Sequence, residues 1–147
     1  MKTKLIIMAI MVTLLLAAGA CSLAIGAKVP QDTEITVPMD DFSNTQQAAR
    51  EAEVAQGGTL TVTLESNPTT GFSWEETAQI TDAAILEQTS NKMLVPEGKG
   101  MVGAAGSQSF TFKAMEKGTT KITLDYSRPW EGGEKDALTC EIDVTVK

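Results

Sequence analysis

The chain has no histidine, and it has few cysteines, aromatic residues and basic residues. Its 147 residues include two Cys, two Trp, one Tyr and four Phe, and 12 Lys and Arg stand against 19 Asp and Glu, for a net charge of −7. Without histidine there is no Ser-His-Asp or Cys-His nucleophilic machinery and no histidine-ligated zinc. The excess of acid argues against nucleic acid as a partner, because phosphate binding needs a basic patch. The length and charge therefore indicate a single small acidic domain.

The N-terminus has the pattern of a secretory signal. Two lysines precede an apolar run over 5–20, which ends in small residues before Cys21. This ending resembles a prokaryotic lipobox, in which the cysteine becomes the lipidated first residue. The triplet at 18–20 also suits ordinary signal peptidase, and the uncharged run over 5–27 is long enough for an uncleaved anchor.

All three alternatives place the folded domain outside the cytoplasm. We expect a lipoprotein-type signal over 1–20 with cleavage before Cys21, a tether over 21–33 and one domain over 34–147. The protein would be held in the cell envelope by its lipid or anchor, or be secreted. Membrane contact is expected only through that N-terminal lipid or anchor, because the acidic domain repels anionic surfaces.

Apolar and polar residues alternate along four runs after residue 58. Leu60, Val62 and Leu64 alternate with threonines, and similar runs lie at 109–113, 121–126 and 138–147. This period of two is typical of half-buried strands. Because glycine- and proline-rich turns separate the runs, the sequence predicts an all-β sandwich or barrel. Cys140 lies on the apolar side of the last run, so a buried thiol is expected.

Two stretches are less regular. Residues 43–55 contain good helix formers and also fit a weak strand, and residues 82–88 are predicted to make one helical turn. Residues 93–95 look extended.

Three connections between the runs have unusual compositions. The first loop, residues 66–74, contains a proline with fixed φ and a glycine free to adopt positive φ. The second loop, residues 100–106, consists largely of small residues, through which a backbone approaches a partner closely. The third loop, residues 127–133, presents an arginine and a tryptophan. Each composition alone also fits an ordinary strand connection.

Together these loops resemble the chagasin family of cysteine-peptidase inhibitors. The resemblance lies in Asn67-Pro68-Thr69-Thr70-Gly71-Phe72, in the small residues at 103–106 and in Arg128-Pro129-Trp130, and it covers roughly 34–147. It implies an immunoglobulin-like antiparallel β-sandwich with three functional loops at one end, and an extended segment at 50–55. It also implies a monomeric, reversible and non-covalent inhibitor of papain-like cysteine proteases, with no enzymatic activity, cofactor or metal.

The resemblance implies that all three loops contact the protease, with the first loop over the catalytic cysteine. The chain departs from the family at Ala105, where glycine is usual. Trp130 has the properties of an interface anchor, and Arg128 either contacts the protease or braces its own loop. Phe72 and Trp74 alternate with a serine, so one or both belong to the core. The expected protease-binding residues are Asn67, Pro68, Thr69, Thr70, Gly71, Phe72, Gly103, Ala104, Ala105, Gly106, Arg128, Pro129 and Trp130.

Two other functions fit parts of the sequence. An immunoglobulin-like envelope module could bind carbohydrate or a surface partner without inhibiting any protease, because such folds host many functions. An enzyme would need paired carboxylates such as Glu75 and Glu76. Adjacent residues on a strand point to opposite faces, so this pair makes a poor acid and base couple.

Overall fold

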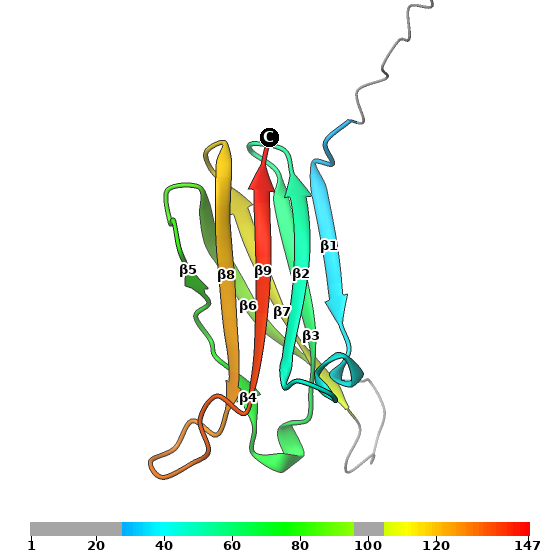
Figure 1. Cartoon of the computed structure of the whole chain (residues 1–147), viewed down its shortest axis with the longest axis vertical. Helices are drawn as coiled ribbons and strands as arrows, with labels where there is room; N and C mark the ends of the chain where they lie inside the picture. The colour runs from blue at the N-terminus through cyan, green and yellow to red at the C-terminus, as the bar shows by residue number, and fades with distance from the viewer. Residues whose placement is uncertain (1–27, 96–104) are drawn as a thin grey trace, which may run out of the picture.

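The computed structural model describes residues 28–95 and 105–147, which form two packed β-sheets (Figure 1). The first sheet has the strand order β1-β3-β7-β6, and the second has the order β2-β9-β8-β4, with β5 also paired to β8. Two short 3-10 helices connect strands. The elements are β1 Asp32–Val37, η1 Met39–Phe42, β2 Gln47–Val54, β3 Thr59–Ser66, η2 Pro68–Thr70, β4 Ser73–Trp74, β5 Gln79–Ile80, β6 Leu86–Leu94, β7 Gly106–Ala114, β8 Gly118–Ser127 and β9 Leu138–Val146.

Most strand pairs are antiparallel, as the resemblance implied. β3 pairs with β7, β6 with β7, and β8 with β9 in this way. Two pairs at the sheet edges are parallel: β1 with β3 and β2 with β9. β1 therefore runs in the same direction as β3, and β2 in the same direction as β9. The observed architecture is therefore an all-β sandwich with two parallel edge pairs.

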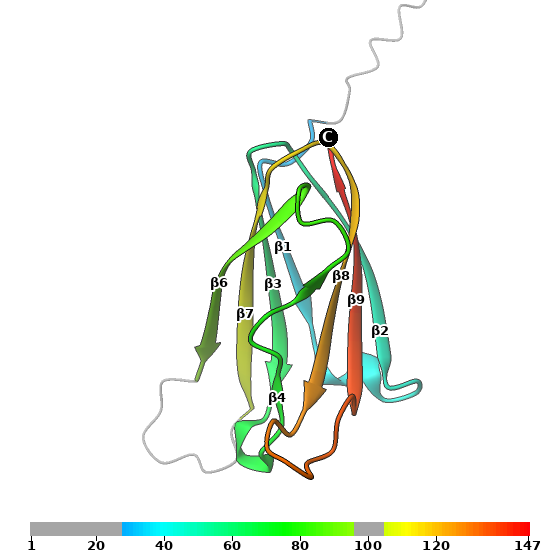
Figure 2. The ribbon, with the colours of Figure 1, turned by 90° about the vertical axis from the view of Figure 1, so that its left-hand side faces the viewer.

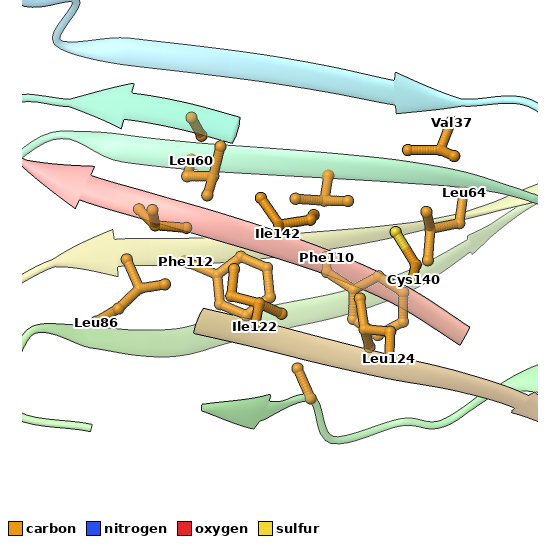
Figure 3. Packing of buried hydrophobic residues seen from close by; sticks show 14 of the residues in the cluster. Val37, Leu60, Leu64, Leu86, Phe110, Phe112, Ile122, Leu124, Cys140 and Ile142 are labelled. Atoms are coloured by element: carbon orange, nitrogen blue, oxygen red, sulfur yellow. The ribbon is translucent and has the colours of Figure 1, made fainter. Parts of the chain in front are cut away.

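The core lies between the sheets and contains the apolar faces that the alternation predicted (Figure 3). Leu60 pairs with Phe112, and Leu124 pairs with Cys140, and all four side chains are fully buried. The buried thiol is thus confirmed. Burial in this apolar layer raises the pKa of Cys140 to about 11, with smaller effects of nearby charged groups.

Contacts with the core determine the structure of the two less regular stretches. The extended assignment of 50–55 is confirmed, because β2 covers Gln47–Val54. The helical turn expected at 82–88 forms only in its first part: the Ile85 N–H donates to the Asp82 carbonyl in a single turn, and β6 begins at Leu86. Leu86 is fully buried, so packing of a strand overrides the local helix preference. β1 begins at Asp32, inside the segment expected as tether.

The two ends of the sandwich differ in what they carry (Figures 1 and 2). One end carries the β3–β4 and β8–β9 connections together with the ends of β6 and β7, and we call it the loop end. The C-terminus and the first described residues lie at the opposite end. There the Ala55 N–H donates to the Pro30 carbonyl and the Gln56 N–H to the Lys147 carbonyl. Within residues 28–95 and 105–147, no helix has the length and apolar character needed to span a bilayer.

Candidate functional site

The first loop is held in one shape by its own hydrogen bonds. The side chain of Asn67 caps η2, since its Oδ1 accepts from the Thr69 N–H at 3.3 Å and from the Thr69 hydroxyl at 2.6 Å. The Thr70 hydroxyl donates to the Asn67 carbonyl at 2.7 Å. Gly71 ends the turn at a φ of +79°, in the left-handed region that favours glycine. Pro68, Thr69 and Thr70 are exposed at the tip.

Contacts with the core hold the base of this loop. The Asn67 N–H donates to the Tyr126 hydroxyl at 3.0 Å, and the Trp74 indole N–H donates to the Glu65 carbonyl at 2.9 Å. The half-buried ring of Phe72 stacks on Tyr126 with 5.4 Å between ring centroids. Trp74 is 1% exposed, so its core assignment is confirmed. The tip therefore rests on a packed aromatic base.

The third loop is also braced from within. The Arg128 N–H donates to the Glu134 carbonyl at 2.8 Å, and the Gly133 N–H donates to the Trp130 carbonyl at 3.1 Å. The Lys135 ammonium group donates to the carbonyls of Arg128, at 2.6 Å, and Trp130, at 3.2 Å. These bonds fold the loop onto itself while Trp130 stays 51% exposed.

Side chains of the third loop pack directly on the first loop. The guanidinium carbon of Arg128 lies 4.3 Å from the centroid of the Phe72 ring and 5.9 Å from that of the Trp130 ring. The Trp130 ring covers Gly71 so closely that a Cβ atom there would lie 2.4 Å from Trp130 Cη2. Arg128 Nε is buried with no hydrogen-bond partner in the described part of the chain, so ring contacts hold the guanidinium. Arg128 thus braces the two loops against each other.

The second loop is described only at its end. Gly103 and Ala104 lie outside the described residues, as does Cys21. Ala105 is exposed, whereas Gly106 is buried at the start of β7 opposite Ser66. A Cβ atom on Gly106 would lie 3.1 Å from the Leu94 carbonyl oxygen and 3.9 Å from Pro68 Cδ. Gly106 therefore lets β6 and the first loop pack closely together and presents no side chain at the surface.

Sequence reasoning missed two residues that shape this end of the molecule. Tyr126 bonds to Asn67 and stacks on Phe72, and Lys135 bonds to two carbonyls of the third loop. The position of Tyr126 at the end of its strand, next to the third loop, was the available signal. No local pattern distinguishes Lys135 from an ordinary surface lysine.

The loop end presents hydroxyl, proline and indole groups on loops that are held by internal hydrogen bonds. Its tips, Thr69, Thr70, Pro129 and Trp130, are exposed, and their backbones are fixed from below. In the described ranges, no three acidic or cysteine side chains gather closely enough to hold a metal ion. A sandwich that presents preorganised loops at one end defines the class of loop-based binding proteins.

Comparison with known proteins gives the family. The model of the family described as Chagasin family peptidase inhibitor I42 matches residues 53–146, and the chain belongs to this family. It is 35% identical to chagasin of Trypanosoma cruzi over 86 residues, which cover 57% of this chain and 77% of chagasin. It is 34% identical to amoebiasin-2 of Entamoeba histolytica over 88 residues, which cover 60% of this chain and 70% of amoebiasin-2.

Solved structures agree on the fold. The cysteine protease inhibitor EhICP2 from Entamoeba histolytica aligns with a TM-score of 0.61 at 21% identity, over 80% of this chain and 99% of that one. PbICP-C, solved in complex with falcipain-2, aligns with a TM-score of 0.56 at 21% identity, over 76% and 98% of the two chains. The expected immunoglobulin-like β-sandwich and the expected family are confirmed. Because the family consists of peptidase inhibitors, the chain is an inhibitor and not an enzyme.

Proposed function

We propose that the chain is a reversible, non-covalent inhibitor of papain-like cysteine proteases, and that its loop end enters the active-site cleft as a wedge. One observation carries the proposal: the Trp130 ring lies on Gly71 and the Arg128 guanidinium lies on Phe72, so two loops form a single rigid edge. Rigidity serves inhibition in two ways. A preorganised edge loses little entropy on binding, and it resists the distortion that peptide cleavage requires.

The exposed groups fit distinct parts of a cleft. The narrow tip at Thr69 and Thr70 would cover the catalytic cysteine, because its backbone is compact and its hydroxyl protons are already donated inside the loop. Pro129 and Trp130 would contact one wall of the cleft, where a half-exposed indole is a strong anchor. The second loop, with Gly103, Ala104 and Ala105, would face the other wall. Gly106 and Arg128 would act from beneath by holding the loops in place.

The relatives support this choice of partner. PbICP-C, which shares the fold, was solved bound to falcipain-2, and EhICP2 is described as a cysteine protease inhibitor. Chagasin itself is among the relatives above 30% identity. A non-inhibitory envelope-binding module, the other function that the sequence allowed, has no comparable support.

We further propose that residues 1–20 are a lipoprotein-type signal and that Cys21 carries the lipid. The described chain begins at the end opposite the loop end, so attachment there would leave the wedge pointing away from the membrane (Figure 1). Labelled palmitate should enter the wild-type protein and not Cys21→Ala. Equal labelling of both would contradict the assignment.

Alkylation of papain tests how the cleft is blocked. One equivalent of the chain should protect the catalytic cysteine of papain from iodoacetamide, and papain activity should return after dilution. Full alkylation in the presence of the bound chain would show that the cleft stays open. Permanent loss of activity after dilution would contradict a reversible mechanism.

A further inference from the structure

A run of three apolar residues is exposed where β6 reaches the loop end. Met93 is 42% exposed, Leu94 48% and Val95 66%. In the described part of the chain, the other exposed large hydrophobic side chains are Trp130 and Met115. Consecutive exposed apolar residues oppose the rule that strand residues alternate between core and solvent, and such patches commonly mark interaction sites.

The edge position of β6 explains the exposure. β6 pairs with β7 on one side only, and the edge of the other sheet next to β8 consists of β4 and β5, which have just two residues each. Met93 therefore does not pack under an opposing strand. It borders an open hollow of about 480 Å³ that is also lined by Trp74, Thr77 and Gln108. In the described part of the chain, Met93 and Leu94, which are adjacent on the strand and so point to opposite faces, are both about half exposed.

This apolar patch, residues 93–95, adjoins the first loop. Leu94 pairs with Ser107, one residue after Gly106. The Leu94 carbonyl oxygen and Pro68 Cδ both lie within 4 Å of the Cβ position of Gly106, at 3.1 Å and 3.9 Å. In Figure 2, β6 runs toward the loop end beside β7. A molecule seated on the first loop would thus reach the patch without any change in the fold.

We propose that Met93, Leu94 and Val95 form a further contact with the inhibited protease, against an apolar surface beside its cleft. The inference rests on the proposed function, because the patch adjoins the loop end and a protease bound there is therefore its nearest partner. Pairing with a second copy through the β6 edge is disfavoured by two features of that strand. It has a register irregularity between Gln88 and Ser90, and it carries Lys92, and both features commonly protect edges from strand addition.

The test compares the triple variant Met93→Ser/Leu94→Ser/Val95→Ser with Met115→Ser. Met115 is 46% exposed and lies in the β7–β8 turn at the opposite end, so it matches the patch in chemistry and exposure but not in place. The full chain is assayed against papain in a mild non-ionic detergent. We expect the triple variant to raise the inhibition constant about tenfold, mainly through faster dissociation, and Met115→Ser to leave it unchanged. Both variants should keep the wild-type melting temperature within a few degrees.

The outcomes separate the patch from the wedge. Wild-type inhibition with no change in the triple variant would overturn the contact at 93–95 and leave the proposed function intact. Absence of inhibition by the wild-type chain would overturn both. A wild-type dimer that becomes monomeric in the triple variant, with inhibition unchanged, would assign the patch to a second copy and overturn the proposal. Backbone amides at 93–95 that exchange more slowly in the papain complex, while amides near Met115 do not, would support it.

Discussion

Replacing Gly71 by alanine should weaken inhibition far more than it weakens the fold. The new Cβ would lie 2.4 Å from Trp130 Cη2, so the indole must retreat by about 1 Å to reach ordinary van der Waals separation. Alanine at a φ of +79° also costs about 1–2 kcal/mol of backbone strain. Because Trp130 is 51% exposed, its retreat uncovers little buried apolar surface, so the loss of stability should stay near that figure. Displacement of an anchor costs about 2 kcal/mol of binding, which raises the inhibition constant about 30-fold.

Gly57→Ala is the matched control. Gly57 has a φ of +81°, and nothing lies within 4 Å of its Cβ position, so this variant carries the same strain without touching Trp130. It should lose similar stability in a urea titration and inhibit papain like the wild type. Equal inhibition by Gly71→Ala and Gly57→Ala would refute the claim that the Trp130 contact sets the shape of the wedge.

A double-mutant cycle tests whether the new methyl group instead clashes directly with the protease. In a Trp130→Ala background, Gly71→Ala should cost less than about threefold in inhibition, because the contact that it disturbs is already gone. A full 30-fold loss in that background would place the effect at the protease surface.

Other variants test the remaining parts of the account. Thr70→Ala and Trp130→Ala should each weaken papain inhibition with less than about 1 kcal/mol lost in chemical denaturation, and equal losses in both assays would make these residues structural. Tyr126→Phe removes the acceptor of the Asn67 N–H and should lower the free energy of unfolding by about 1 kcal/mol. The same variant should also inhibit papain more weakly than the wild type. Cys140→Asp buries an unpaired charge and should cost about 3–5 kcal/mol, and full stability would refute the core assignment. The unfolded thiol ionises near its ordinary pKa of 9.0 and the buried thiol near a pKa of about 11. Wild-type stability should therefore fall by up to about 3 kcal/mol between pH 9 and pH 11 relative to Cys140→Val, and parallel curves for both would contradict the shift.

The strands could be predicted from the sequence because their signal is local. Leu60, Val62 and Leu64 alternate with threonines, and that period of two requires no knowledge of the partner strand. The direction of pairing is not encoded in this way. β1 and β2 have patterns that fit either direction, so their parallel pairing with β3 and β9 appears only in the structure.

The site was predicted at the level of its loops and not at the level of its contacts. The motifs indicated which residues form the loops, and the resemblance implied that the loops share one end. The packing of Trp130 on Gly71 and of Arg128 on Phe72 depends on how two distant segments meet, which no local pattern contains. No local pattern predicts the contact of Phe42 with Trp74 either. Their ring centroids lie 5.4 Å apart, and this contact helps to fix the base of the first loop.

Titration of papain with the purified full chain tests the central claim most directly. Residual activity is followed at fixed enzyme concentration, and the chain is afterwards examined for cleavage by mass spectrometry. We expect a dose-dependent loss of activity that approaches one inhibitor per enzyme, with the segment from Asn67 to Phe72 uncut. Undiminished activity at micromolar excess, in papain and in several related proteases, would contradict it and favour an envelope-binding role for the same fold.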